Sequence, residues 1–294
     1  MYMPNLMNDF AFKYVFGADT IESNNALKGL LETFLERKIV SVQLKNRELT
    51  KNLEMMKNTK FDILVRFDDS VRVDIEMQVF IDLDELKERL VYYCARLHGE
   101  QDLKGKLYSE ADKSYVLAFL NGNLFKDDAY YHRVQLYTDE HELFNDTMGL
   151  YFVELKKLKD SKTNEQLNSK EQLMYYILNC QNKETNSRIK EMVENNEVIQ
   201  VIDKRVNEID DDSWKKLDED FAALHENERA VKLQRAEEKG EARGIAIGEA
   251  RGESRGMLEE RRKNIKSLST ILSSQQIADT LNLSLDEVEN LLNS

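Results

Sequence analysis

Two strand-like segments joined by a short polar tip are the most regular pattern in the chain. Residues 60–67 and 71–80 are rich in Val, Ile and Phe, and their apolar and polar positions alternate as in a half-buried strand. In the second segment the apolar side chains Val71, Val73, Ile75, Met77 and Val79 share one face, and Arg72, Asp74, Glu76 and Gln78 share the other. The pattern predicts a β-hairpin with one buried face.

The length of the tip sets which residues of this hairpin lie opposite each other. A three-residue tip at 68–70 pairs Phe67 with Val71 and, counting back along both strands, Asp62 with Glu76. Directly opposed residues have Cβ atoms about 4.5–5.5 Å apart. Two carboxylates at that distance repel each other unless a cation lies between them, and divalent ions prefer oxygen ligands. The hairpin therefore predicts a metal site, although a solvated polar face would have the same pattern.

The remaining periodicity predicts a mixed α/β region followed by helices only. Before the hairpin, 5–16 and 22–37 are predicted helices and 39–49 is extended; after it, a helix runs over about 82–103. Further strands are expected at 114–120, which is apolar throughout, and at 130–138 and 149–156. From about 164 onward we expect helices at 165–181, 184–208 and from 211. We therefore divide the chain into an α/β domain (1–160), a helical domain (161–235), a glycine-repeat helix or linker (236–263) and a small helical hairpin (264–294).

Glycines recur every four residues near the C-terminus, at 240, 244, 248, 252 and 256. Each glycine inside a helix costs about 1 kcal/mol relative to alanine, so an isolated helix would not favour five of them. Close packing of two helices in a homodimer explains the repeat, and a flexible linker is the alternative. Capping boxes at Ser273–Gln276 and Ser284–Glu287 predict the final helical hairpin. Its second helix offers mainly acidic residues, so we expect it to mediate interaction or dimerisation and not to read DNA bases.

Composition narrows the function classes. The 294-residue chain carries a net charge of −13, so a nucleic-acid-binding surface would have to be assembled from local basic residues. It contains no apolar run long enough to span a membrane and no basic-then-apolar leader, and we expect a cytoplasmic protein. The four histidines show no metal-binding spacing, and the two cysteines, far apart in the sequence, are expected to be buried thiols.

The hairpin resembles the core of the PD-(D/E)XK nucleases, and four features in order extend the likeness to the recombination-promoting nuclease (Rpn) branch, the PD-(D/E)XK family transposases. The features are Asn8–Phe16, Asp62 with the Ile75–Gln78 block, a following helix with Arg89, Tyr92 and Tyr93, and the Gly-Glu-Ala-Arg repeat. The resemblance implies a restriction-endonuclease-like α/β core with a mixed sheet, followed by an all-α C-terminal region. It also implies metal-dependent DNA endonuclease activity linked to recombination, transposition, mobile elements or phage.

The resemblance also assigns roles to residues. Asp62 and Glu76 would be catalytic metal ligands, Asp9 a third acidic contributor, and Gln78 would replace the usual lysine as the residue that orients water. The expected ion is Mg²⁺, with Mn²⁺ or Ca²⁺ as alternatives. For contact with DNA we select Arg89 and Arg96, which lie near each other on the predicted helix, and Lys13. The alternative for the helix is an exposed basic stripe, and the alternative for the chain is a catalytically decayed nuclease fold that binds nucleic acid or regulates a partner.

Overall fold

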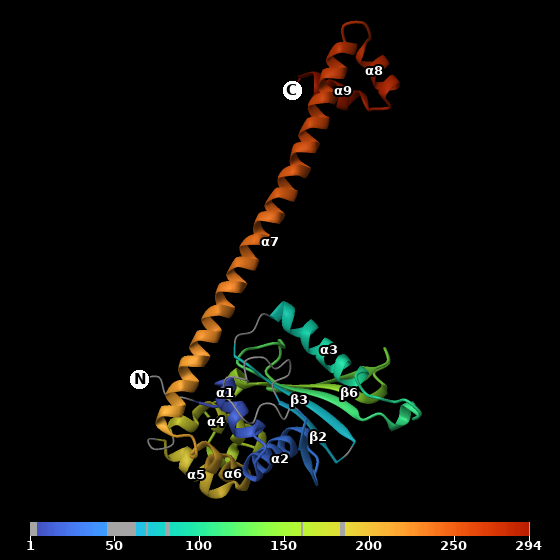
Figure 1. The fold of residues 1–294 in the computed structure, drawn as a ribbon. Helices are drawn as coiled ribbons and strands as arrows, with labels where there is room; N and C mark the ends of the chain where they lie inside the picture. The colour runs from blue at the N-terminus through green and yellow to red at the C-terminus, as the bar shows by residue number, and fades with distance from the viewer. Residues whose placement is uncertain are drawn as a thin grey trace. The chain divides into compact units, whose positions relative to one another are not determined.

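A computed structural model describes residues 5–45, 63–68, 70–79, 83–159, 161–182 and 186–293 (Figure 1). It divides into two compact units, residues 1–225 and 226–294. Asp62 lies outside the described residues, as do residues 46–49 of the segment predicted to be extended at 39–49.

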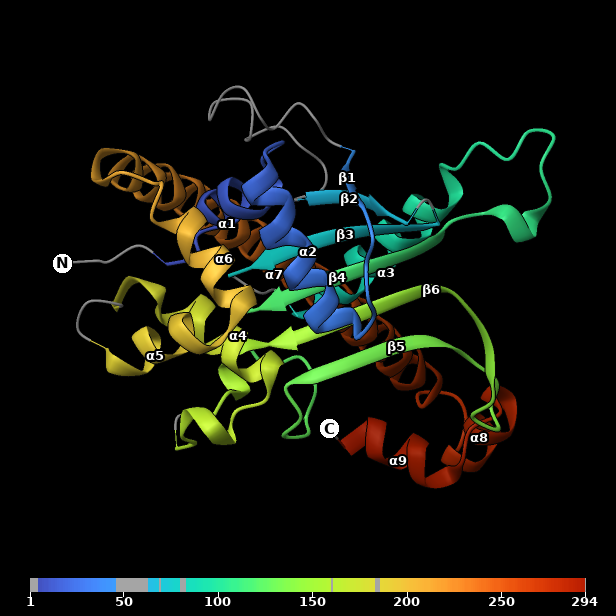
Figure 2. The same cartoon turned by 90° about the horizontal axis from the view of Figure 1, so that it is seen from below.

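The first unit is built on a six-stranded sheet in the order β1-β2-β3-β4-β6-β5, which Figure 2 shows from below. The strands are β1 (Val42–Leu44), β2 (Ile63–Phe67), β3 (Val71–Gln78), β4 (Lys113–Leu120), β5 (Tyr131–Tyr137) and β6 (Leu143–Glu154). Strands β3, β4 and β6 are parallel to one another. The pairs β1–β2, β2–β3 and β5–β6 are antiparallel. The predicted mixed sheet is confirmed.

The hairpin register predicted from the sequence is present in the described part of β2 and β3. Phe67 pairs with Val71, and Ile63, the first described residue of β2, pairs with Ile75. Asp68 adopts a left-handed conformation at φ 49° in the tip, where its Oδ1 accepts hydrogen bonds from the backbone N–H groups of Val40 and Ser41 at 2.8 and 3.1 Å. Aspartate tolerates a left-handed conformation better than most residues, so the chain can reverse within a short tip. The short tip places Phe67 opposite Val71 and so fixes the register of the two strands.

Helices cover both faces of the sheet (Figure 1). Helix α3 (Leu83–Gly99) lies on one face and contributes Leu86, Leu90 and Cys94 to a small apolar cluster with β4 and β6. The other face forms the main core with α1 (Asp9–Gly17), α2 (Ile21–Leu35), α4 (Ser169–Asn179), α5 (Ser187–Asn195), α6 (Glu197–Val206) and the first turns of α7 (Asp211–Leu268). Helices within the segment 161–235 thus share a core with the sheet, and the first compact unit extends to residue 225.

For three elements, a local interaction accounts for the difference from the predicted limits. Helix α1 begins at Asp9 because Asn8 caps it, with its side chain accepting from the N–H groups of Phe10 and Ala11. The helix predicted at 184–208 is two helices, since Asn196 ends α5 and caps α6. Strand β6 begins at Leu143, six residues early, because its polar first half is paired with β5.

The second unit contains the rest of α7 and the helices α8 (Ser274–Leu281) and α9 (Leu285–Asn293). Ile265 of α7 packs with Ile277, Ala278 and Val288 in a small apolar cluster. The predicted capping boxes are confirmed: Ser273 pairs with Gln276, and Ser284 with Glu287.

Candidate active site

Two predicted catalytic residues lie at the carboxyl end of β3, on the face covered by α3. The apolar positions of β3, from Val71 to Met77, point into the main core, so the alternating residues Asp74, Glu76 and Gln78 point the other way. Glu76 is nearly buried, at 4% exposure, although it is charged when ionised. Such burial of a carboxylate is costly without compensating partners, and its surroundings supply them.

The side chain of Gln78 connects Glu76 to Arg89. Its amide Nε2 donates to Glu76 Oε2 at 2.8 Å, and its Oε1 accepts a hydrogen bond from Arg89 Nη2. Arg89 lies on α3, so the chain Glu76–Gln78–Arg89 joins the strand to the helix. Since one end of the amide faces a carboxylate and the other a guanidinium, both the orientation and the rotamer of Gln78 are fixed.

The structure places the other predicted site residues in different surroundings. Asp9 lies half-buried in the first turn of α1 and Lys13 is buried at 5% exposure, both on the helix that packs against the main core. Arg96, two turns beyond Arg89 on α3, pairs with Glu100 at 2.5 Å. Arg89 is the proposed DNA contact that bonds directly to Gln78.

The donor set suits a hard divalent ion but is incomplete in the described residues. Among them, no three His, Cys, Asp or Glu side chains come close enough together to hold a metal. A carboxylate offers about four lone-pair sites, so the bond from Gln78 is compatible with metal binding by Glu76. Asp62, the other predicted ligand, immediately precedes the first described residue of β2. The oxygens of Glu76 are of the kind that Mg²⁺ takes as ligands, and Asp62 stays a predicted ligand.

A second charged group, which sequence reasoning missed, lies at the same end of the parallel strands as Glu76 and Gln78. Glu154 is fully buried at the end of β6. In the strand register, Gln78 of β3 pairs with Leu120 of β4, and Leu120 pairs with Glu154. Its carboxylate lies 2.8 Å from Lys157 Nζ and 3.1 Å from His132 Nδ1, and accepts from the backbone N–H of Phe125. The group fixes the loop between β4 and β5 beside the site. Its sequence signal was an acidic residue that ends an apolar strand.

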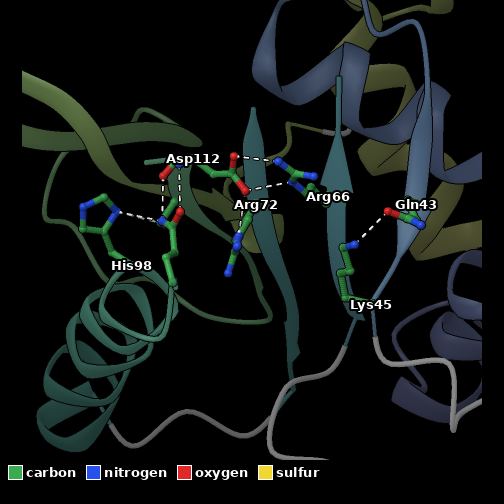
Figure 3. Close-up of polar contacts among 8 residues, drawn as sticks. Gln43, Lys45, Arg66, Arg72, His98 and Asp112 are labelled. Carbon is green, nitrogen blue, oxygen red and sulfur yellow. Dashed lines mark hydrogen bonds and ion pairs between the residues drawn. The ribbon is translucent and has the colours of Figure 1, made fainter. Parts of the chain in front are cut away.

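A third group, also missed, lies toward the other end of β3 (Figure 3). Asp112 accepts two hydrogen bonds from Arg66, at 2.8 and 2.9 Å, and one from Arg72 Nε at 2.9 Å. Burial alone would raise the pKa of the Asp112 carboxyl, but the hydrogen bonds and charges of the two arginines outweigh it and lower that pKa. The two arginines stand out as polar positions in the hairpin, but Asp112 carries no local sequence signal.

Neither cysteine is placed for nucleophilic chemistry. Burial raises the pKa of the Cys94 thiol to about 11 and that of Cys180 to about 12. Both thiols therefore stay protonated at neutral pH and act as small apolar side chains.

Comparison with known families identifies the chain. The model of the PD-(D/E)XK nuclease family transposases matches residues 6–234. The chain belongs to this family. The match covers the whole sheet, its helices and the start of α7, so the resemblance read from the hairpin is confirmed. No curated protein and no solved structure matches the chain. The described helices include none that is long and apolar enough to cross a membrane.

Proposed function

We propose that this protein is a metal-dependent DNA endonuclease that hydrolyses phosphodiester bonds at the carboxyl end of β3. The observation that supports this most is the contact chain from Glu76 through Gln78 to Arg89, in a member of a nuclease family. In this proposal Glu76 and Asp62 hold Mg²⁺. When bound, the ion would polarise a phosphoryl oxygen and lower the pKa of a coordinated water.

Gln78 and Arg89 would share the work of the lysine that is usual at this position. The amide of Gln78 can orient a water molecule but carries no charge. Arg89 supplies the positive charge, and its hydrogen bond to Gln78 Oε1 keeps it beside the site. A guanidinium there would stabilise negative charge that develops on the phosphate during hydrolysis.

Cleavage of supercoiled plasmid tests the proposal. The purified wild type should nick DNA in Mg²⁺ or Mn²⁺ and not in EDTA, and Glu76→Ala should abolish nicking. Arg89→Gln should slow it by about 10²-fold or more, the cost typical of losing one stabilising donor, and Arg89→Lys should recover part of the rate. Lys87→Gln is the matched control, because Lys87 is exposed on the same helix.

The same assay separates the alternative function. No cleavage in any metal, together with retained DNA binding, would establish the decayed nuclease fold that acts by binding or regulation. The net charge of −13 and the glutamine at position 78 favour that alternative. Cleavage that survives Glu76→Ala would mean that the active site lies elsewhere.

The proposal includes a homodimer formed through the C-terminal helices. At each of the five α7 glycines, an added Cβ would have no neighbour within 4 Å, so nothing in the described part of the chain accounts for their small size. Exposed Ile245 and Ile247 lie between two of them. Sedimentation should show a dimer for the wild type and a monomer for Gly248→Leu, and a wild type that sediments as a monomer would exclude it.

A further inference from the structure

We propose that Arg66, Arg72 and Lys45 form a row that binds the phosphate backbone of DNA on the α3 side of the sheet. This inference rests on the proposed function, because it assigns the surface along which the nuclease's substrate runs. It also answers how a chain of net charge −13 could bind a polyanion.

The strand register brings the row together. Gln43 of β1 pairs with Arg66 of β2, Arg66 with Arg72 of β3, and Arg72 with Ser114 of β4. Directly paired residues point to the same side of a sheet, so these four side chains cross the α3 face in one line. Lys45 follows Gln43 by two residues and bonds to it, with Nζ 2.7 Å from Gln43 Oε1 (Figure 3).

Arg66, Arg72 and Lys45 lie to one side of the apolar cluster beneath α3. The small cluster beneath α3 takes its sheet residues from β4 and β6, and in the described residues none come from β1, β2 or β3. Arg66 and Arg72 accordingly keep 27% and 29% of their side chains exposed, and Lys45 is exposed. The row is therefore accessible to a large ligand.

Asp112 holds the two arginines in place. It accepts from both guanidinium groups while its own side chain is only 7% exposed. Two adjacent guanidiniums would repel each other without such a bridge. Arg66, Arg72 and Lys45 carry three positive charges beside the one negative charge of Asp112, and guanidinium donors suit phosphate oxygens.

The row lies at a suitable distance from the candidate active site. Arg72 and Glu76 are four residues apart on the same face of β3, which is about 13 Å. One DNA strand carries a phosphate about every 3.4 Å of helix axis, so a duplex over Glu76 would reach the row within about four nucleotides. Asp74 lies between them but is fully buried, so it does not place an exposed charge along the path.

Fluorescence anisotropy of a short labelled duplex, titrated with the full-length protein at several salt concentrations, tests the row. Ca²⁺ and EDTA arms show whether binding depends on a divalent ion. Lys45→Gln and Arg72→Gln should each weaken binding and reduce the slope of log K against log salt by about 0.9, the value for one lost phosphate contact. Arg72→Lys keeps the charge and should keep the slope. Lys204→Gln is the control, because Lys204 is exposed on α6, which packs on the opposite face.

The outcomes separate this inference from the proposed nuclease activity. Lys45 is exposed, so Lys45→Gln does not put the fold at risk. An unchanged slope in this variant and in folded Arg72→Gln would overturn the proposed row. Absence of any DNA binding by the wild type would overturn it too. Reduced slopes in the variants, with no cleavage by the wild type, would support the DNA-binding row and reject the endonuclease activity. Cleavage that needs Glu76, with unchanged slopes, would support the endonuclease activity and reject the DNA-binding row.

Discussion

Replacing Asp112 by asparagine should destabilise the first unit, because this carboxylate joins β2, β3 and the start of β4. The wild-type group has three hydrogen bonds of 2.8–2.9 Å from two guanidiniums. Bonds to charged groups contribute about 1.5–3 kcal/mol each, but the arginines are more than a quarter exposed and water replaces part of the loss. Asparagine also retains one acceptor oxygen. We expect the free energy of unfolding to fall by about 2 kcal/mol near neutral pH.

The effect should depend on pH in one direction. The folded protein lowers the pKa of Asp112, so the ionised group stabilises the fold above the unfolded pKa of about 3.9. This contribution is lost as the pH falls through the lower, folded pKa. The difference between wild type and Asp112→Asn should therefore be full near neutral pH and shrink below about pH 4.

Urea titration followed by tryptophan fluorescence measures this difference. Trp214 is the only tryptophan, and it packs against the main core of the first unit, so its signal reports the unfolding of this unit. Asp139→Asn, an exposed carboxylate at the tip of the β5–β6 hairpin, is the control and should change stability by less than about 0.5 kcal/mol. A loss below that value for Asp112→Asn, or an equal loss at low pH, would refute the reasoning.

Three further predictions concern packing, capping and thiol chemistry. Gly29→Ala should cost about 1–3 kcal/mol in the same titration, because a Cβ there would lie 2.7 Å from Val198 Cγ1 of α6; Gly99→Ala, with nothing within 4 Å, should be nearly neutral, and equal effects would contradict this account. Asn196→Ala should cost about 1 kcal/mol, since it removes the cap that accepts from two N–H groups of α6; no change would mean that the cap does not stabilise it. Cys94 is buried and its thiol has a pKa of about 11, so it should react with a thiol reagent only after unfolding. Rapid labelling of the native protein would show that the packing around Cys94 opens.

The sequence determined the local features of this protein. The alternation in the hairpin and its three-residue tip predicted the Phe67–Val71 pairing, because strand period and turn length act between neighbours in the chain. The continuous apolar run at 114–120 predicted β4, whose central residues are buried by clusters on both faces. The family followed from the same local features, and the family match bears it out.

Only the tertiary structure decided which distant side chains meet. Arg89 was one of several basic residues on a predicted helix, and its bond to Gln78 depends on how α3 crosses the sheet. The contact of Asp112 with two arginines requires β4 to lie parallel to β3, which no periodicity specifies. A polar residue at the start of a strand has the same local pattern whether it meets water or a guanidinium. The long-range packing that determines strand order also determines which side chains a polar residue contacts. That packing brings charged residues that are distant in the sequence together in one site.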